Sequence, residues 1–210
     1  MSSRLRALRP IALVAAAVSL SACISVFPKE APSQLYRFDG IPAAAPTASA
    51  GTTDSFGVVR INGGFVQAAS SDRIVAVTGE RIAYIADARW VSPASVLFNE
   101  ALLRTFDYNA GPARLVTRGE VRKAEYALRI DVTRFEAVYD RGEKAAPNIV
   151  VGLRLNLVKA EDRTLAGSKM IEATVRADDN RISAIVRAFD EAVAQALSQT
   201  VDWTNARGAA

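Results

Sequence analysis

Residues 149–159, Ile-Val-Val-Gly-Leu-Arg-Leu-Asn-Leu-Val-Lys, are the stretch that decides the fold. Apolar side chains occupy alternate positions along most of this stretch, whereas Arg154 and Asn156 fall between them. Such alternation indicates a β-strand that buries one face and leaves the other face in water. The chain is therefore expected to contain a sheet with a hydrophobic core on one side.

The two stretches that flank this strand extend the sheet. Residues 124–138 alternate in the same way until the pattern changes phase near Phe135, which predicts a β-bulge. Residues 165–176 follow the polar turn 161–163 and are predicted to pair back as an antiparallel hairpin. Further strands are predicted at residues 35–38, 56–61, 73–77 and 81–85, the last two joined as a hairpin.

Two helices are predicted to cover this sheet. The first starts at Ser92-Pro93, a cap residue followed by proline at the first helical position, and runs to about Asp107. The second carries apolar residues at intervals of three or four from Ile182 to Val201. The predicted fold class is α+β, a two-layer single domain with two main helices packed on one face of a mostly antiparallel β-sheet.

The N-terminus has the pattern of a secretory leader. Three arginines precede the apolar stretch 11–22, which at about 12 residues is too short for the roughly 20 that a membrane-spanning helix needs. The stretch ends in Leu-Ser-Ala-Cys, which resembles the bacterial lipobox, where the cysteine sulfur receives a diacylglycerol and becomes the new N-terminus. Cys23 is therefore the predicted lipidation site. The alternative is an ordinary secreted protein with a chance cysteine at its cleavage site.

These patterns divide the chain into four predicted segments. Residues 1–22 are the signal peptide, and residues 23–33 are a tether between the lipid and the fold. Residues 34–203 form the folded domain, and residues 204–210 are predicted to be a disordered tail. The mature chain of about 190 residues suits a single domain with a real core.

Charge and composition narrow the function classes. Three of the 26 cationic residues lie in the leader, so the mature chain carries 23 against 22 acidic residues, and no basic stripe suggests nucleic-acid binding. The chain has no histidine, and with Cys23 acylated it has no free thiol, which excludes Cys/His zinc sites, Ser-His-Asp triads and disulfides. Gly63-Gly64 lacks the Lys-Ser/Thr of a phosphate-binding loop. No metal or other cofactor is expected, and no enzymatic activity.

Two acidic pairs nevertheless leave a hydrolase or a cation site open as an alternative. They are Glu161 with Asp162, and Asp178 with Asp179. The first pair lies in a predicted turn and the second lies in the predicted cap of the last helix, where aspartate has local structural reasons to be. The structural interpretation is therefore preferred for both pairs.

The neighbours Arg89 and Trp90 are the candidate partner-binding residues, because Arg and Trp dominate interface hot spots. The alternative is that Trp90 fills the junction of sheet and helix as core, with Arg89 on the surface. Core positions on strands are expected for the other aromatic candidates, Tyr36, Tyr84, Tyr126 and Phe135.

Three stretches carry a resemblance to a known family. Residues 35–38 (Leu-Tyr-Arg-Phe) follow soon after the lipobox, residues 72–93 run from Asp-Arg-Ile-Val to Arg-Trp-Val-Ser-Pro, and residues 128–136 end in Arg-Phe-Glu. In this order, over about residues 34–200, the chain resembles the ABC-type transport auxiliary lipoproteins, a PqiC-like family. It departs from the family pattern at residues 62–71, where Gly-Gly replaces a Pro-x-Tyr-Leu-type approach to the next strand.

The resemblance implies a lipid-anchored periplasmic subunit without catalytic activity. Such a subunit binds an MCE-family protein and, through it, an ABC permease and ATPase that move lipids or hydrophobic compounds. Ring-forming members of the family imply a homo-oligomeric ring here too. Ile24 is not the aspartate that retains many lipoproteins in the inner membrane, so the outer membrane is favoured. A structural or assembly lipoprotein of another envelope complex and a small lipid-binding carrier remain as alternatives.

Overall fold

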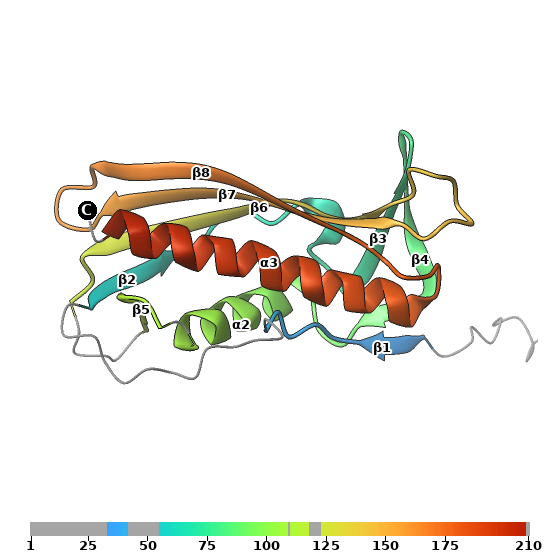
Figure 1. Ribbon diagram of the computed structural model, residues 1–210, viewed down its shortest axis with the longest axis horizontal. Coiled ribbons are helices and arrows are strands. Elements are labelled where there is room, and N and C mark those ends of the chain that lie inside the picture. Colours follow the sequence, from blue (N-terminus) through green and yellow to red (C-terminus); the bar gives the residue numbers. More distant parts are fainter. Residues whose placement is uncertain (1–32, 42–54, 109, 118–122, 209–210) are drawn as a thin grey trace, which may run out of the picture. The chain divides into compact units, whose positions relative to one another are not determined.

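Both predicted helices pack against one eight-stranded sheet in the described part of the computed structural model (Figure 1). The structure describes residues 33–41, 55–108, 110–117 and 123–208. This arrangement confirms the predicted two-layer α+β domain. The helices are α2 (Ala94–Asp107) and α3 (Ile182–Gly208); the strands are β1 (Gln34–Tyr36), β2 (Phe56–Ile61), β3 (Arg73–Thr78), β4 (Arg81–Trp90), β5 (Ala113–Val116), β6 (Tyr126–Val138), β7 (Asn148–Lys159) and β8 (Leu165–Arg176), with the 3-10 turn η2 (Gln67–Ala69) before β3.

Strands β6, β7 and β8 form the predicted antiparallel meander. The register of β6 against β7 shifts between Val132 and Arg134, which confirms the β-bulge expected near Phe135. The alternation of β7 is also confirmed, because its core-facing positions are completely buried. These positions are Ile149, Val151, Leu153, Leu155 and Leu157.

One edge of β6 is shared by two different strands. Its first four residues pair in parallel with β2, and its last two residues pair in parallel with β3. Between them, a single bridge joins Phe65 to Val132, and a Cβ on Gly63 would lie only 1.7 Å from the carbonyl oxygen of Ile130. Glycine at position 63 therefore lets the chain cross close to β6 at the place where the sheet divides.

The parallel pairings were not part of the sequence prediction. Strand β2 also pairs in parallel with β5, and β1 pairs in parallel with β4. The antiparallel ladders of β3–β4 and β6–β7–β8 nevertheless contribute most of the paired residues, so the sheet is mostly antiparallel as expected.

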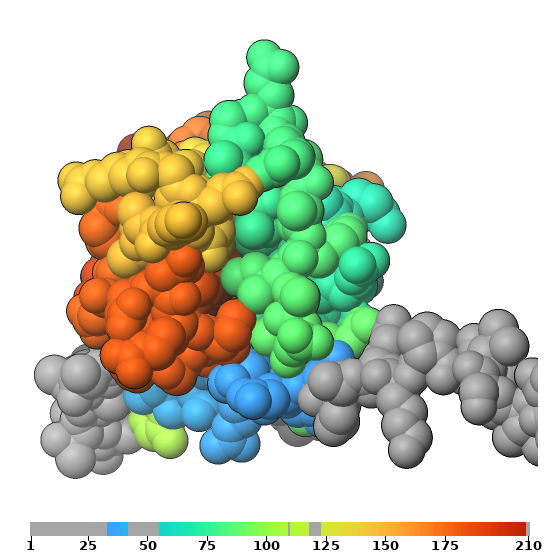
Figure 2. Space-filling model, turned by 90° about the vertical axis from the view of Figure 1, so that its right-hand side faces the viewer, coloured from blue at the N-terminus to red at the C-terminus, as the bar shows by residue number. Residues whose placement is uncertain are grey.

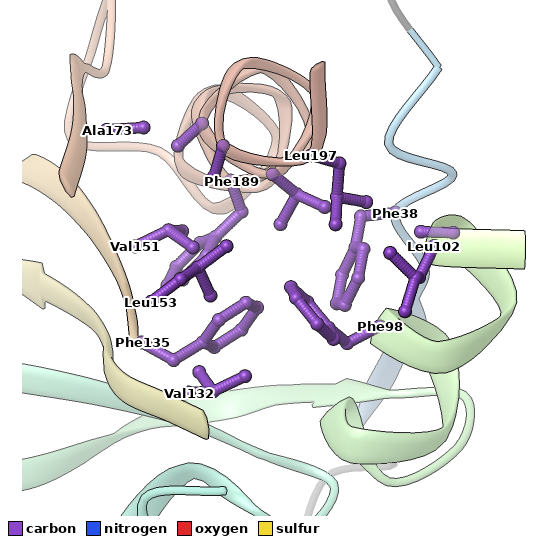
Figure 3. Close-up of a cluster of buried hydrophobic side chains, with 14 of the residues drawn as sticks. Phe38, Phe98, Leu102, Val132, Phe135, Val151, Leu153, Ala173, Phe189 and Leu197 are labelled. Carbon is purple, nitrogen blue, oxygen red and sulfur yellow. The ribbon is translucent and has the colours of Figure 1, made fainter. Parts of the chain in front are cut away.

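An aromatic cluster fills the space between sheet and helices (Figure 3). Phe38, Phe98, Phe135 and Phe189 come from the segment after β1, from α2, from β6 and from α3, and their rings converge in one layer. The Phe135 ring centroid lies 5.5 Å from that of Phe38 and 5.1 Å from that of Phe189. Each such side chain contributes about 1.5–3 kcal/mol through burial, so this cluster is a main source of stability.

The opposite face of the meander is charged. Arg134 pairs with Glu172 at 3.1 Å across two strands. The guanidinium of Arg129 donates hydrogen bonds to Asp131, and the backbone N–H of Gly64 donates another to the same carboxylate at 2.7 Å. These contacts, the one with Arg129 first, hold the pKa of Asp131 below its usual range.

The start of α2 differs from the prediction. The cap position is Pro93 rather than Ser92, and no side chain caps the helix by a hydrogen bond. Instead, the backbone N–H of Ala94 donates to the carbonyl of Ser71 at 2.9 Å, and the Ser95 hydroxyl donates to the carbonyl of Ser70 at 3.1 Å. The loop before β3 therefore satisfies the helix start, which local sequence rules could not reveal.

The end of α3 corrects a second expectation. Residues 204–208, predicted to belong to a disordered tail, continue the helix to Gly208. Thr204 is fully buried, and Gly208 lies so close to the Phe56 ring that a Cβ there would overlap it. The helix continues because its last turn covers the start of β2. Residues 209–210 lie outside the described residues.

Candidate functional site

The predicted lipidation site, Cys23, lies outside the described residues, together with the predicted signal peptide and residues 23–32 of the tether. Lipidation therefore stays a prediction from the lipobox pattern. Among the residues that the structure does describe, no helix combines the length and the hydropathy needed to cross a membrane.

The two candidate partner-binding residues, Arg89 and Trp90, differ in their burial. Trp90 is only 2% exposed, and its ring packs edge-on against Phe38 at 5.1 Å and Phe189 at 5.3 Å. The partner-binding interpretation of Trp90 is corrected here, because a side chain enclosed by core rings presents no surface. Arg89 is partly exposed and pairs with Asp72 at 3.2 Å, so a role in partner binding stays a prediction for this residue alone.

The first acidic pair has the local role in a turn that the structural interpretation expected, whereas the helix cap expected of the second pair stays a prediction. Asp162 accepts hydrogen bonds from the backbone N–H and hydroxyl of Thr164, which lower its pKa. Asp179 accepts a hydrogen bond from Arg181 at 2.6 Å, which lowers its pKa as well. A general acid needs a raised pKa, so neither contact prepares a proton donor. The two pairs also stand at opposite ends of the twelve-residue strand β8, roughly 40 Å apart at ~3.3 Å per residue.

A hairpin of β3 and β4 projects from the body of the domain (Figure 2). Near its tip Ile82 is 61% exposed, and Tyr84 lies beneath the Arg73 guanidinium at 3.7 Å from the ring centroid. At its base, β1 pairs with β4 and places exposed Leu35 beside Arg89. We call these five residues, Leu35, Arg73, Ile82, Tyr84 and Arg89, the hairpin surface.

Strand β4 changes direction below this hairpin. Its register against β3 jumps by several residues between Tyr84 and Arg89, and Asp87 adopts a left-handed backbone with φ of 56°. Above the jump, no described strand pairs with the outer edge of residues 81–87. The hairpin surface therefore combines apolar side chains, arginines and an unpaired strand edge, a combination suited to binding another chain.

A second feature lies between β2 and α2, where the sequence places a charge in an apolar register. Phe56 and Val58 on β2 face the core, and Arg60 follows them at the next inward position. Arg60 lines two cavities of about 580 Å³ and 340 Å³ beside α2. Its Nε atom is buried without a hydrogen-bond partner, and burial lowers the pKa of the guanidinium.

The walls of these two cavities are mainly apolar. Leu103 of α2 and Leu115 of β5 contribute to the larger one, and Phe65 and Ile130 contribute to the smaller one. None of the described lining residues is acidic. Sequence analysis missed this site, although the period-two pattern of residues 56–61 already places Arg60 on the inward face.

Comparison with known proteins identifies the class to which this fold belongs. Residues 36–201 match the family described as ABC-type transport auxiliary lipoprotein component, and the chain belongs to this family. The crystal structure of protein XCC0632 from Xanthomonas campestris, of family DUF330, superposes with a TM-score of 0.68 at 21% identity, over 85% of this chain and 97% of that one. The crystal structure of a second, uncharacterized protein gives a TM-score of 0.62 at 12% identity, over 83% and 99% of the two chains.

One curated relative is longer than this chain. It is an uncharacterized protein of Bradyrhizobium diazoefficiens, 30% identical over 120 residues, which are 57% of this chain and 31% of the relative. The family assignment therefore rests on the match over residues 36–201, and the two solved structures support the fold.

Proposed function

We propose that this chain is a lipid-anchored auxiliary subunit of an MCE-type ABC transport system that moves lipids or hydrophobic compounds between the inner and outer membranes. The observation that carries the proposal is the family match over residues 36–201, preceded by a lipobox ending in Cys23. Acyl chains on Cys23 would anchor the domain, since each buried methylene contributes about 0.8 kcal/mol. The residue after the cysteine, Ile24, favours the periplasmic face of the outer membrane.

In this proposal the domain acts by binding rather than by catalysis. The hairpin surface is the proposed contact for the MCE-family protein, through which the domain reaches the permease and ATPase. Exposed Ile82 and Leu35 supply apolar contact area, and Arg73 and Arg89 supply charge at the same face. The outer edge of β4 can receive a strand of the partner by β-augmentation. A homo-oligomeric ring around the end of the partner's tunnel is proposed on the family resemblance alone.

Affinity purification tests the partner. The full chain, produced with its own leader in its native host and extracted from membranes in mild detergent, should retain an MCE-family protein, a permease and an ATPase. Ile82→Asp should reduce this retention at least about tenfold, because a desolvated carboxylate in an interface is costly. Met170→Asp on β8 is the matched control, because Met170 is 60% exposed and Ile82 is 61% exposed.

The outcomes separate the alternatives. Retention of a different envelope complex without any MCE-family protein would instead support a structural or assembly lipoprotein. Equal retention by both aspartate variants would refute the hairpin surface as the contact. The anchor is tested separately, because Cys23→Ala should remove the protein from the outer-membrane fraction, and its persistence there would contradict lipid anchoring.

A further inference from the structure

Arg60 is the charged residue whose position the fold itself does not explain. It follows Phe56 and Val58 on the inward face of β2, and within the described residues its guanidinium has no ion pair and its buried Nε has no hydrogen-bond partner. The Nε atom of Arg104 of α2 is also buried without a partner, but a terminal nitrogen of Arg104 donates to the carbonyl of Asp39 at 3.1 Å and pairs with its carboxylate at 3.6 Å. Arg60 differs from Arg104 because no ion pair compensates the charge of its guanidinium within the described residues.

An unpaired guanidinium in this position is unfavourable. Half-burial removes water from the charge, and native proteins normally compensate such a group with a counter-ion or with hydrogen bonds. An apolar side chain of similar length would fill the same space without this cost. The arrangement becomes favourable once an anion enters from outside and pairs with the guanidinium, since charge-assisted hydrogen bonds are among the strongest.

The surroundings indicate what kind of anion fits. Both cavities include Arg60 and Asn62 in their walls, so the cation stands where the two spaces adjoin. Beyond it the walls carry apolar side chains, Leu103 and Leu115 on one side and Phe65 on the other, together with a few neutral polar residues. Their volumes, about 580 Å³ and 340 Å³, fall in the range of ~300–1,000 Å³ that small-molecule sites occupy.

We propose that the space between β2 and α2 binds a single-chain amphiphile with an anionic head, its carboxylate or phosphate paired with Arg60 and its hydrocarbon chain against Leu103, Leu115 and Phe65. Asn62 and Asn99 supply neutral amide groups near the head. None of the described lining residues is acidic, so none of these residues competes for the cation.

This inference goes beyond the proposed function, because a subunit that acts only by docking needs no ligand site of its own. It is independent of the partner as well. An assay on the single chain tests it, so its failure would leave the MCE partnership untouched, and the reverse also holds.

Photocrosslinking of the full mature chain is the direct test. The protein is placed in nanodiscs of neutral phosphatidylcholine, exposed to a diazirine-bearing palmitic acid, irradiated, and digested for mass spectrometry. Labels should fall on peptides that contain residues 59–65 and 95–103. Arg60→Met should lower this labelling about tenfold, because it removes a charge-assisted contact. The control is Arg154→Met, on the opposite, exposed face of the sheet.

Competitors then define the head group. Oleate or oleoyl lysophosphatidic acid should displace the probe, and which of the two does so identifies the carboxylate or the phosphate as the preferred head. Monoolein, which has the same chain without charge, should compete about tenfold less well. Equal competition by monoolein, displacement by inorganic phosphate alone, or labels confined to other peptides would overturn the proposal.

Two further measurements guard against misfolding. The thermal midpoint of Arg60→Met should equal or exceed that of the unmodified protein, whereas a purely structural arginine would lower it on removal. Leu103→Asp provides a second variant at the cavity wall, where the side chain is 40% exposed and its replacement leaves the core intact. An aspartate there supplies an anion itself, so labelling should fall; unchanged labelling in both variants would refute the site.

Discussion

Replacing Trp90 by alanine distinguishes a core residue from a binding hot spot. The side chain is 2% exposed and contacts the rings of Phe38, Phe189 and Phe135 at centroid distances of 5.1, 5.3 and 6.4 Å. Truncation of a buried Trp or Phe costs about 3–5 kcal/mol, and three aromatic neighbours place Trp90 in the upper part of this range. That is a large share of the roughly 5–15 kcal/mol by which a domain is stable.

Urea unfolding followed by far-ultraviolet circular dichroism measures this loss on the purified mature protein. In a parallel thermal scan, a loss of about 4–5 kcal/mol should lower the midpoint of Trp90→Ala by roughly 8–20 °C, given ~2–4 °C per kcal/mol for a domain of this size. Trp90→Phe should recover much of the loss because it keeps an aromatic ring in the cluster. Arg89→Ala is the matched surface control, and an exposed ion pair of this kind contributes at most about 1 kcal/mol. A Trp90→Ala protein within 1 kcal/mol of the parent would refute the core assignment.

Three further predictions concern parts of the fold that sequence patterns did not reveal. Gly63→Ala should destabilise the domain by at least about 2 kcal/mol in urea unfolding, because the new Cβ would lie 1.7 Å from a backbone atom. Gly64→Ala is the control and should be close to neutral, because the nearest atom to its Cβ would lie 3.5 Å away. Equal losses of stability in the two variants would contradict the close approach of Gly63 to β6. The folded-state pKa of Asp131 is lowered, so its contribution to folding stability is present above the unfolded pKa of about 3.9 and is lost as pH falls through the folded value. The urea midpoint should therefore drop less on acidification in Asp131→Asn than in the parent protein. Parallel acid profiles of the two proteins would contradict this prediction. Deleting residues 204–210 should destabilise the domain by about 2 kcal/mol or more, because it removes buried Thr204 and uncovers Phe56; an unchanged midpoint would restore the tail prediction.

The parts of the fold that sequence analysis predicted are those that depend on the pattern of residues within a single helix or strand. The alternation of residues 149–159, the phase change near Phe135 and the three-to-four spacing from Ile182 all depend on neighbours within one element. The structure confirms each of them. Because an element's period alone decides which face it buries, these features need no knowledge of distant residues.

The parts that were missed depend on residues far apart in the chain. The four residues of β5 are too few to show a recognisable alternation of apolar and polar side chains. They form a strand because β2 pairs with them. The cap of α2 is supplied by the carbonyl of Ser71, and the last turn of α3 is held by Phe56. No rule about local propensity can supply partners of this kind.

The candidate site residues likewise include some features that local patterns predict and others that depend on distant residues. Arg89 and Trp90 are adjacent in sequence, yet alternation along β4 sends one side chain outward and the other into the core. Composition alone could not decide between hot spot and core. The inward position of Arg60 could have been predicted from the period-two pattern of β2. The absence of a partner for its buried Nε and the adjoining cavities could be recognised only in the structure.

The way in which the β3–β4 hairpin joins the edge of β6 has a consequence for how this domain can evolve. Strand β3 joins β6 through two residue pairs close to the hairpin turn, where the backbone N–H of Tyr139 also donates to the carbonyl of Val77 and Arg81 pairs with Glu143. The exposed side chains Ile82 and Tyr84 of the same hairpin lie outside the helix-covered core, so their substitution should leave that core undisturbed. The surface that the hairpin presents can therefore change at a few exposed positions, while one unchanged scaffold keeps its stability.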